Sequence, residues 1–152
     1  MATTSKAGDG TQLSADQPCL FVYGTLMPHI PSPASAYLRS RARDLGPAQL
    51  PGFLYDMGSY PGLVYAPGSS ELVKGQLMQL HEPATLIELD RYEGLHEDSP
   101  EYERRSLIIS GKATWVYCYL GSTQGLPLIN SGDYVSYYRQ HPRHLAFIQA
   151  GR

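Results

Sequence analysis

Glu93 is the residue of this chain whose position most strongly suggests chemistry. It lies near the end of residues 83–94 (PATLIELDRYEG), which begin with a proline and end with a glycine, as helices often do. At about 100° per residue, Glu93 projects on the same side as Leu86 and Leu89. A carboxylate on the apolar side of a helix must be paired, hydrogen-bonded or protonated, and burial raises its pKa. These are the properties of a general base.

The same glutamate also has a simpler interpretation. Most glutamates near a helix C-terminus are solvated or pair with a neighbouring arginine, and Arg91 and Arg104 are the candidates here. The helix alone does not decide between these interpretations, because the residues at a helix end are the hardest to assign to a face. A catalytic role for Glu93 therefore needs support from other parts of the chain.

Short apolar runs along the chain are typical of a small α+β protein. The run CLFVYG at residues 19–24 is continuous and ends with a glycine, which predicts a buried strand. Further strands are predicted at residues 50–68, as brief strands joined by tight turns, and at 73–80, 104–109 and 113–120. Besides 83–94, short helices are predicted at 32–43 and 132–140. We expect a small mixed β-barrel with short flanking helices, because closing a barrel removes exposed strand edges.

The length of 152 residues and the hydrophobic content of 42% fit one domain with a substantial core. Residues 1–17 are rich in Thr, Ser, Gly and Asp, and we expect a disordered N-terminal arm because they have little apolar surface to bury. The folded domain is expected at residues 18–140. Residues 141–152 are expected to form a C-terminal tail in which His141 and His144 are solvated.

Composition also limits the partners and cofactors. A formal net charge of −2 without runs of like charge argues against nucleic acid or an anionic membrane as a partner. No apolar run has membrane-spanning length and the first 18 residues lack a secretion signal, so we expect a cytoplasmic protein. His141 and His144 are not expected to bind a metal, because no third ligand is obvious and Pro142 between them would break the helix that could align their rings. Cys19 and Cys118 lie in predicted strands and are expected to be buried, reduced thiols.

The segment YGTL at residues 23–26 is a second candidate for a functional site. It follows directly on the predicted buried strand, where backbone N–H groups leave the sheet and can face an anion. The lysine of a phosphate-binding loop is missing. By itself this segment is an ordinary turn.

Several motifs occur together in an order that is informative. They are YGTL at residues 23–26, GFLYD at 52–56, GSYP at 58–61, VKG at 73–75, LDxxEG at 89–94, YxR at 102–104 and GDY at 132–134. With these motifs the chain resembles the γ-glutamylcyclotransferase family, particularly the branch that includes γ-glutamylamine cyclotransferases and plant AIG-like proteins. The resemblance covers residues 18–138.

The resemblance implies a small mixed barrel whose cavity cyclises γ-glutamyl compounds to 5-oxoproline and a free amine, without a metal or cofactor. The glutamate of the LDxxEG motif, here Glu93, is implied as the acid/base residue. Substrate contacts are implied from the YGTL turn, which is formed by Tyr23, Gly24, Thr25 and Leu26. Tyr102 of the YxR motif is expected to bind substrate, to orient Glu93 or only to pack at a strand edge. Arg104 is expected to pair with a carboxylate or to lie at the surface.

The implied reaction explains why these residue types are needed. The α-amine of the substrate must lose a proton before it can attack the γ-carbonyl of the same molecule, and Glu93 is the proposed base. Once protonated, the same carboxyl group can protonate the departing amine. N–H groups of the YGTL turn would hold either the substrate carboxylate or the developing oxyanion.

Three questions stay open from the sequence. The residues after YGTL, 27–31 (MPHIP), differ from the glycine-containing loop of familiar relatives and are expected to border the cavity. The amine half of the substrate is therefore open among γ-glutamyl amino acids, γ-glutamyl-lysine isopeptides and glutathione. The main alternative is a non-catalytic protein that binds or senses a γ-glutamyl or other carboxylate metabolite, and a third is a protein-interaction scaffold. The oligomeric state is not predicted.

Overall fold

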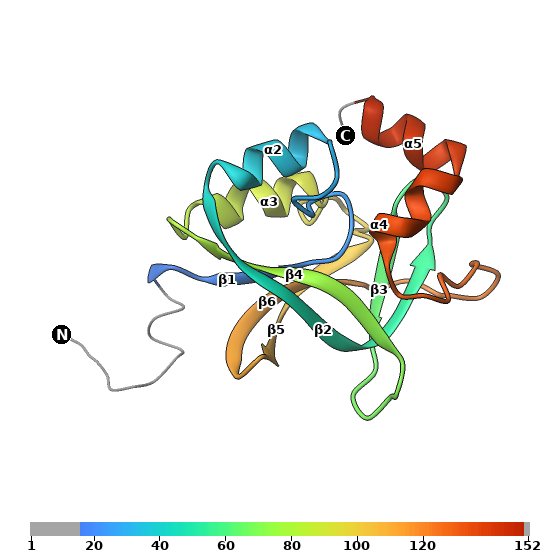
Figure 1. Ribbon diagram of the computed structural model, residues 1–152, viewed down its shortest axis with the longest axis horizontal. Helices are drawn as coiled ribbons and strands as arrows, with labels where there is room; N and C mark the ends of the chain where they lie inside the picture. The colour runs from blue at the N-terminus through green and yellow to red at the C-terminus, as the bar shows by residue number, and fades with distance from the viewer. Residues whose placement is uncertain (1–15, 151–152) are drawn as a thin grey trace.

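The computed structural model describes residues 16–150, so almost all of the predicted N-terminal arm lies outside the described residues. The described chain forms a six-stranded mixed sheet with short helices around it (Figure 1). The strands are β1 (Cys19–Val22), β2 (Ala42–Asp56), β3 (Pro61–Tyr65), β4 (Leu72–Leu80), β5 (Tyr102–Ile109) and β6 (Lys112–Tyr119). The helices are α2 (Pro33–Arg39), α3 (Thr85–Tyr92), α4 (Tyr134–Tyr137), the 3₁₀ helix η1 (Tyr138–Gln140) and α5 (Pro142–Gln149).

The strand order is β3-β2-β4-β1-β6-β5, which places β1 in the interior of the sheet. β1 runs antiparallel to β4 and parallel to β6, so Leu20 lies opposite Met78 on one side and Trp115 on the other. The sheet curls into a half-barrel, with α2 and α3 together at one end and α4 and α5 over β3 (Figure 1). The predicted fold class, α+β with a small mixed barrel and short flanking helices, is confirmed.

The core explains why the continuous run CLFV forms an interior strand. All four residues of β1 are buried, because the strand has neighbours on both edges and side chains packed on both faces. Leu54 and Leu63 from the β2–β3 hairpin and Leu89 from α3 are buried in the same core. The YGTL turn begins where β1 ends, and its position is therefore fixed by the most buried part of the sheet.

The long strand β2 corrects two predictions. The helix predicted at 32–43 ends at Arg39, and the brief strands predicted within 50–68 include the last part of a single strand of 15 residues. A bulge between Asp44 and Gly46, where Gly46 has a φ of 108°, lets this strand bend without ending. Pro47 and Pro51 fall where β2 pairs only with β4, so their missing N–H groups interrupt no second ladder.

The C-terminal segment also differs from the prediction. Residues 142–149 form α5, in which Pro142 occupies the first turn, where a proline is compatible with a helix. His144 is only 1% exposed, so the prediction that it is a solvated tail residue is wrong. Its burial is explained by Asp56, whose Oδ1 lies 2.8 Å from His144 Nε2.

Candidate active-site pocket

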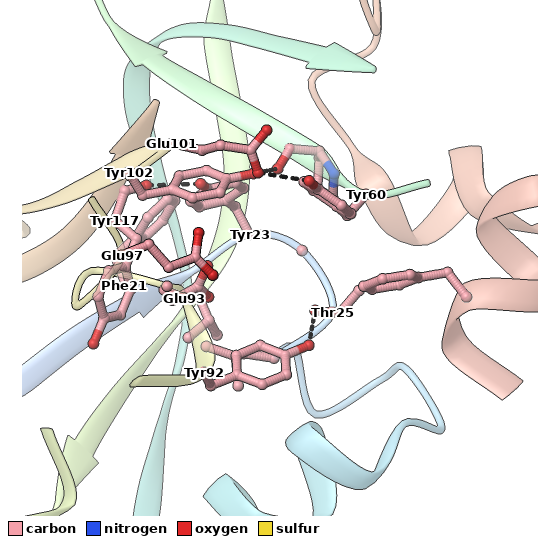
Figure 2. Close-up of a pocket in the computed structure, with 16 residues that line it drawn as sticks. Phe21, Tyr23, Thr25, Tyr60, Tyr92, Glu93, Glu97, Glu101, Tyr102 and Tyr117 are labelled. Atoms are coloured by element: carbon pink, nitrogen blue, oxygen red, sulfur yellow. Dashed lines mark hydrogen bonds between the residues drawn. The ribbon is translucent and has the colours of Figure 1, made fainter. Parts of the chain in front are cut away.

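A pocket of about 110 Å³ lies between the end of β1, the end of α3, β5, β6 and α5 (Figure 2). All six residues that the sequence singled out for the site line this pocket: Tyr23, Gly24, Thr25, Leu26, Glu93 and Tyr102. They come from three separate segments of the chain, which the fold brings together. In Figure 2, Glu93 lies between Tyr92 on one side and Tyr23 and Tyr102 on the other.

The end of α3 fixes the position of Glu93. Glu93 caps the helix, and Gly94 follows with a φ of 78°, a left-handed conformation that glycine adopts without strain. The N–H groups of Gly94 and Leu95 donate to the carbonyls of Arg91 and Asp90, each at 3.0 Å, which is the Schellman pattern of a helix end. The predicted helix at 83–94 is therefore observed as Thr85–Tyr92, and its glycine stop is what directs Glu93 into the pocket.

The environment of Glu93 favours its protonated form. Burial, and then the nearby negative charge of Asp90, raise the pKa of Glu93 from 4.5 to about 8. The C-terminal end of α3, where the helix dipole is negative, acts in the same direction. Among residues 16–150 no hydrogen bond to the Glu93 carboxyl group contributes to this shift. A half-buried carboxyl group without such a partner inside a cavity is available to a ligand.

Neither arginine that could have paired with Glu93 does so. Arg104 forms a bidentate ion pair with Asp90, at 2.8 Å from Nε to Oδ1 and 3.0 Å from Nη2 to Oδ2. Arg91 pairs with Glu88 on the exposed side of α3 at 3.2 Å. Tyr117 also donates to Asp90 Oδ1, at 2.7 Å, and burial raises its pKa far above the ordinary value. Asp90 thus accepts hydrogen bonds from two residues, Arg104 and Tyr117. Asp90 is the aspartate of the LDxxEG motif, but these two partners were not predicted from the sequence.

The YGTL segment forms a tight turn closed by its own backbone. Met27 N–H donates to the carbonyl of Gly24 at 2.9 Å, a bond that leaves the N–H groups of Thr25 and Leu26 outside the turn's own closure. The side chains are engaged within the protein: the Tyr23 hydroxyl donates to the Tyr117 carbonyl at 2.7 Å, and Leu26 is buried in the core. Contacts from this turn to a ligand would therefore come mainly from the backbone.

Two further hydroxyl groups organise the pocket. Thr25 Oγ1 lies 2.9 Å from the Tyr92 hydroxyl, which ties the turn to the last residue of α3. The Tyr102 hydroxyl donates to the carbonyl of Pro61 at 2.8 Å, and burial raises its pKa well above the ordinary value. Tyr102 is thus anchored to β3 rather than hydrogen-bonded to Glu93.

Several pocket residues were not predicted individually. They are mostly aromatic or acidic: Phe21, Tyr60, Tyr92, Tyr117, Phe147, Glu97 and Glu101. The only signal in the sequence was the excess of twelve tyrosines over three phenylalanines, which fits several tyrosines in a partly polar cavity but, for most of them, favours ordinary strand packing. The loop 27–31, expected to border the pocket, is not part of its lining, because Met27 and Ile30 are buried in the core instead.

The described pocket lining contains three glutamates and no lysine, arginine or histidine. Within residues 16–150, no group of three or more histidine, cysteine, aspartate or glutamate side chains is arranged to hold a metal ion. None of the helices described has the length and apolarity needed to span a membrane.

Comparisons with known proteins identify the family and agree with the fold. A family model described as gamma-glutamyl cyclotransferase, AIG2-like, matches residues 20–136. The gamma-glutamylcyclotransferase family protein YtfP of Escherichia coli (strain K12) is 34% identical over 117 residues, which cover 76% of this chain and 95% of that protein.

Two solved structures are similar to the chain. The solution NMR structure of protein ytfP from Escherichia coli superposes with a TM-score of 0.60 at 30% identity, covering 78% of this chain and 97% of that one. The crystal structure of an aig2-like protein from Mus musculus gives a TM-score of 0.58 at 25% identity, covering 76% and 88%. The chain therefore belongs to the γ-glutamylcyclotransferase family, in its AIG2-like group.

Proposed function

We propose that this protein converts a γ-glutamyl amine or γ-glutamyl amino acid to 5-oxoproline and a free amine, with Glu93 as the general acid and base. The observation that carries the proposal is the Glu93 carboxyl group, which lies in the pocket with no hydrogen bond contributing to its raised pKa. Keeping such a group buried disfavours its charged form and has no evident structural benefit. Family membership supports the same activity.

The reaction needs two proton transfers between nitrogen atoms of one substrate. The α-ammonium group gives a proton to the Glu93 carboxylate, and the neutral amine then attacks the γ-carbonyl carbon. A carbon–nitrogen bond forms and the carbonyl oxygen becomes negative. Glu93, which now holds the first proton, gives it to the nitrogen of the amine half as the bond between that nitrogen and the carbonyl carbon breaks and the carbonyl forms again. The Glu93 carboxylate then accepts the second proton from the attacking nitrogen and passes it to the free amine, which leaves as an ammonium ion, so that Glu93 ends as a carboxylate.

The substrate itself would prepare Glu93 for the first step. With a pKa of about 8 in the empty pocket, the carboxyl group is mostly protonated near neutral pH. An α-ammonium group beside it favours the carboxylate and lowers that pKa. Because nucleophile and electrophile belong to one molecule, the rest of the pocket has mainly to hold the folded conformer that closes a five-membered ring.

The turn after β1 supplies the complementary binding elements. The described pocket lining has no cationic side chain, so the negative groups of the substrate must be bound by neutral donors. The N–H groups of Thr25 and Leu26, which the turn does not use for its own closure, are the donors proposed for the carboxylate or the oxyanion. Tyr23 and Tyr102 form the walls beside them.

The proposal is tested by incubating the purified protein with a panel of γ-glutamyl compounds and measuring 5-oxoproline. We expect turnover of at least one compound by the wild type, and a loss of roughly 100-fold or more in Glu93→Gln. Glu88→Gln is the matched control, because Glu88 lies on the exposed side of the same helix and should leave activity unchanged.

The same panel separates the enzyme from the alternative. Equal activity of the wild type and Glu93→Gln would refute the role of Glu93. Tight binding of a γ-glutamyl compound without any 5-oxoproline would instead identify a binding or sensing protein.

A further inference from the structure

We propose that α5 forms the wall of the pocket that selects the amine half of the substrate, and that Phe147 is its specificity-determining residue. The inference rests on the proposed function, in that it assumes a γ-glutamyl ligand. It concerns an element that lies beyond the family match, which ends at residue 136.

The first step of the argument is that α5 is fixed to the sheet. His144 is buried and joins two partners, Asp56 at 2.8 Å through Nε2 and the Tyr134 hydroxyl at 2.6 Å through Nδ1. Tyr137 donates to the other oxygen of Asp56 at 2.6 Å. Ile148 is buried in the core on the same side of the helix as His144. A helix held in this way is part of the pocket's rigid frame.

The second step is that this frame presents an aromatic ring to the cavity. Phe147 lies three residues after His144, lines the pocket, and has its ring centroid 5.2 Å from that of Tyr60. Tyr60 is itself held by a 2.6 Å hydrogen bond to Glu101. In Figure 2 the C-terminal helices stand across the pocket from β5 and β6. Together Phe147 and Tyr60 form an aromatic wall.

The third step assigns this wall to one half of the ligand. The γ-glutamyl half carries two charged groups, an α-amine and a carboxylate. In the proposed function the α-amine needs Glu93, and the carboxylate needs the N–H groups of the YGTL turn. Aromatic faces do not favour a carboxylate, and they can offer an ammonium group a cation–π contact but no acceptor for its proton, whereas they pack well against apolar chains. The amine half is therefore the part that contacts Phe147, and the wall favours amines that carry an apolar chain of several carbons.

The test compares two synthetic ligands that share the γ-glutamyl half. γ-Glutamyl-methylamide carries one carbon on its amide nitrogen, whereas γ-glutamyl-hexylamide carries six and so offers the aromatic wall an apolar chain. Their affinities are measured by calorimetry with Glu93→Gln, which should bind without turnover, and their kcat/KM values with the wild type. We expect the hexylamide to be favoured by roughly tenfold, and we expect Phe147→Ala to bring the ratio of the two affinities to about one.

Leu145→Ala is the matched control. Leu145 is on the same helix and packs against the core, but it does not line the pocket, so its removal should keep the preference for the hexylamide. Equal affinity of Glu93→Gln for the two ligands, with Phe147 intact, would overturn the inference. So would a preference that survives in Phe147→Ala or disappears equally in Leu145→Ala.

The two proposals fail in different ways. A preference in affinity that depends on Phe147, with no 5-oxoproline formed, would support the aromatic wall and refute the cyclotransferase activity. Turnover of both amides at equal efficiency would support the activity and refute the wall. Absence of binding by either amide would overturn both.

Discussion

At the scale of single residues, Glu93 occupies a position that is unfavourable for a negative charge in three respects. It is partly shielded from water, it follows Asp90 by three residues, and it lies at the negative end of α3. Arg104 offsets part of this by binding Asp90 with both prongs of its guanidinium group. The protein thus stabilises the carboxylate of Asp90 with a cation, whereas the carboxyl group of Glu93 has no such partner among the described residues.

This arrangement predicts how stability depends on pH. Below pH 4.5 Glu93 is protonated in both the folded and unfolded states, and between pH 4.5 and about 8 it is ionised mainly in the unfolded state. The contribution of Glu93 to the free energy of unfolding is therefore full at low pH and is lost as the pH rises toward 8. Glu93→Gln has no such group, so its stability relative to the wild type should increase from pH 5 to pH 8, as measured by urea unfolding.

The control for this measurement is Glu88→Gln, whose difference from the wild type should stay nearly constant over the same range because Glu88 is exposed. A constant difference for Glu93→Gln as well would mean that its carboxyl group is solvated. This result would weaken the proposed mechanism without any assay of activity.

At the scale of elements, the pocket depends on close contact between the turn after β1 and the start of β3. A Cβ atom added at Gly24 would lie 2.7 Å from Cγ of Pro61, which is closer than a Cβ atom approaches a non-bonded carbon atom in proteins. The Pro61 carbonyl in turn accepts the hydrogen bond of Tyr102. The glycine of YGTL is therefore needed for the approach of two elements, and not only for the conformation of the turn.

We expect Gly24→Ala to lower the free energy of unfolding by about 1–3 kcal/mol, because the ring of Pro61 must move. Removing that ring should relieve the overlap, so the double variant Gly24→Ala/Pro61→Ala should be more stable than the sum of the two single changes predicts. Chemical denaturation of the four proteins measures this coupling. Additive losses would show that the contact with Pro61 is not the reason for glycine at this position.

The same elements show what the sequence could and could not reveal. A continuous apolar run was sufficient for β1, and the glycine after Glu93 was sufficient for the end of α3. β2 was fragmented in the prediction because its two glycines and two prolines are typical of turns, whereas here the pairing with β3 and β4 accommodates them. α5 was missed because Pro142 was interpreted as a helix breaker.

The six residues predicted for the site could be selected from the sequence because the order of the motifs resembles that of a known family. The structure places all six around one pocket. The residues that were missed are placed by contacts between distant segments. His144 was expected in solvent, since its partner Asp56 is 88 residues away in sequence and no local pattern connects them. Phe147 lies on α5, which that contact helps to hold in place, and such a contact has no local signature.

At the scale of the whole molecule, the Asp56 carboxylate joins the end of the β2 strand to the C-terminal helices. Burial raises the pKa of Asp56, but the hydrogen bonds that it accepts, led by the one from Tyr137, outweigh this and lower the pKa below its ordinary value of 3.8. One charged group thus connects α4, α5 and the sheet.

A depressed pKa gives the opposite pH dependence to that of Glu93. The stability contributed by the Asp56 charge is present above pH 3.8 and is lost as the pH falls through the lower folded-state pKa. Asp56→Asn should therefore be less stable than the wild type by about 1–3 kcal/mol at pH 7. The difference should shrink in strong acid.

Thermal unfolding at pH 7 and below pH 3 measures this change, with Asp98→Asn in an exposed loop as the control. A difference between Asp56→Asn and the wild type that does not depend on pH would contradict the charge-based account of how the C-terminal helices are held.

The interior position of β1 has a consequence for biosynthesis. Cys19 pairs with Thr114 of β6, which leaves the ribosome about 95 residues later, and at roughly 5–20 residues per second that interval is about 5–20 s. During this interval β1 cannot pair with β6, and the pocket residues of β5, β6 and α5 are not yet present beside the YGTL turn. The pocket is therefore completed only when nearly the whole domain has been synthesised, so that a truncated nascent chain carries the motif without a working cavity.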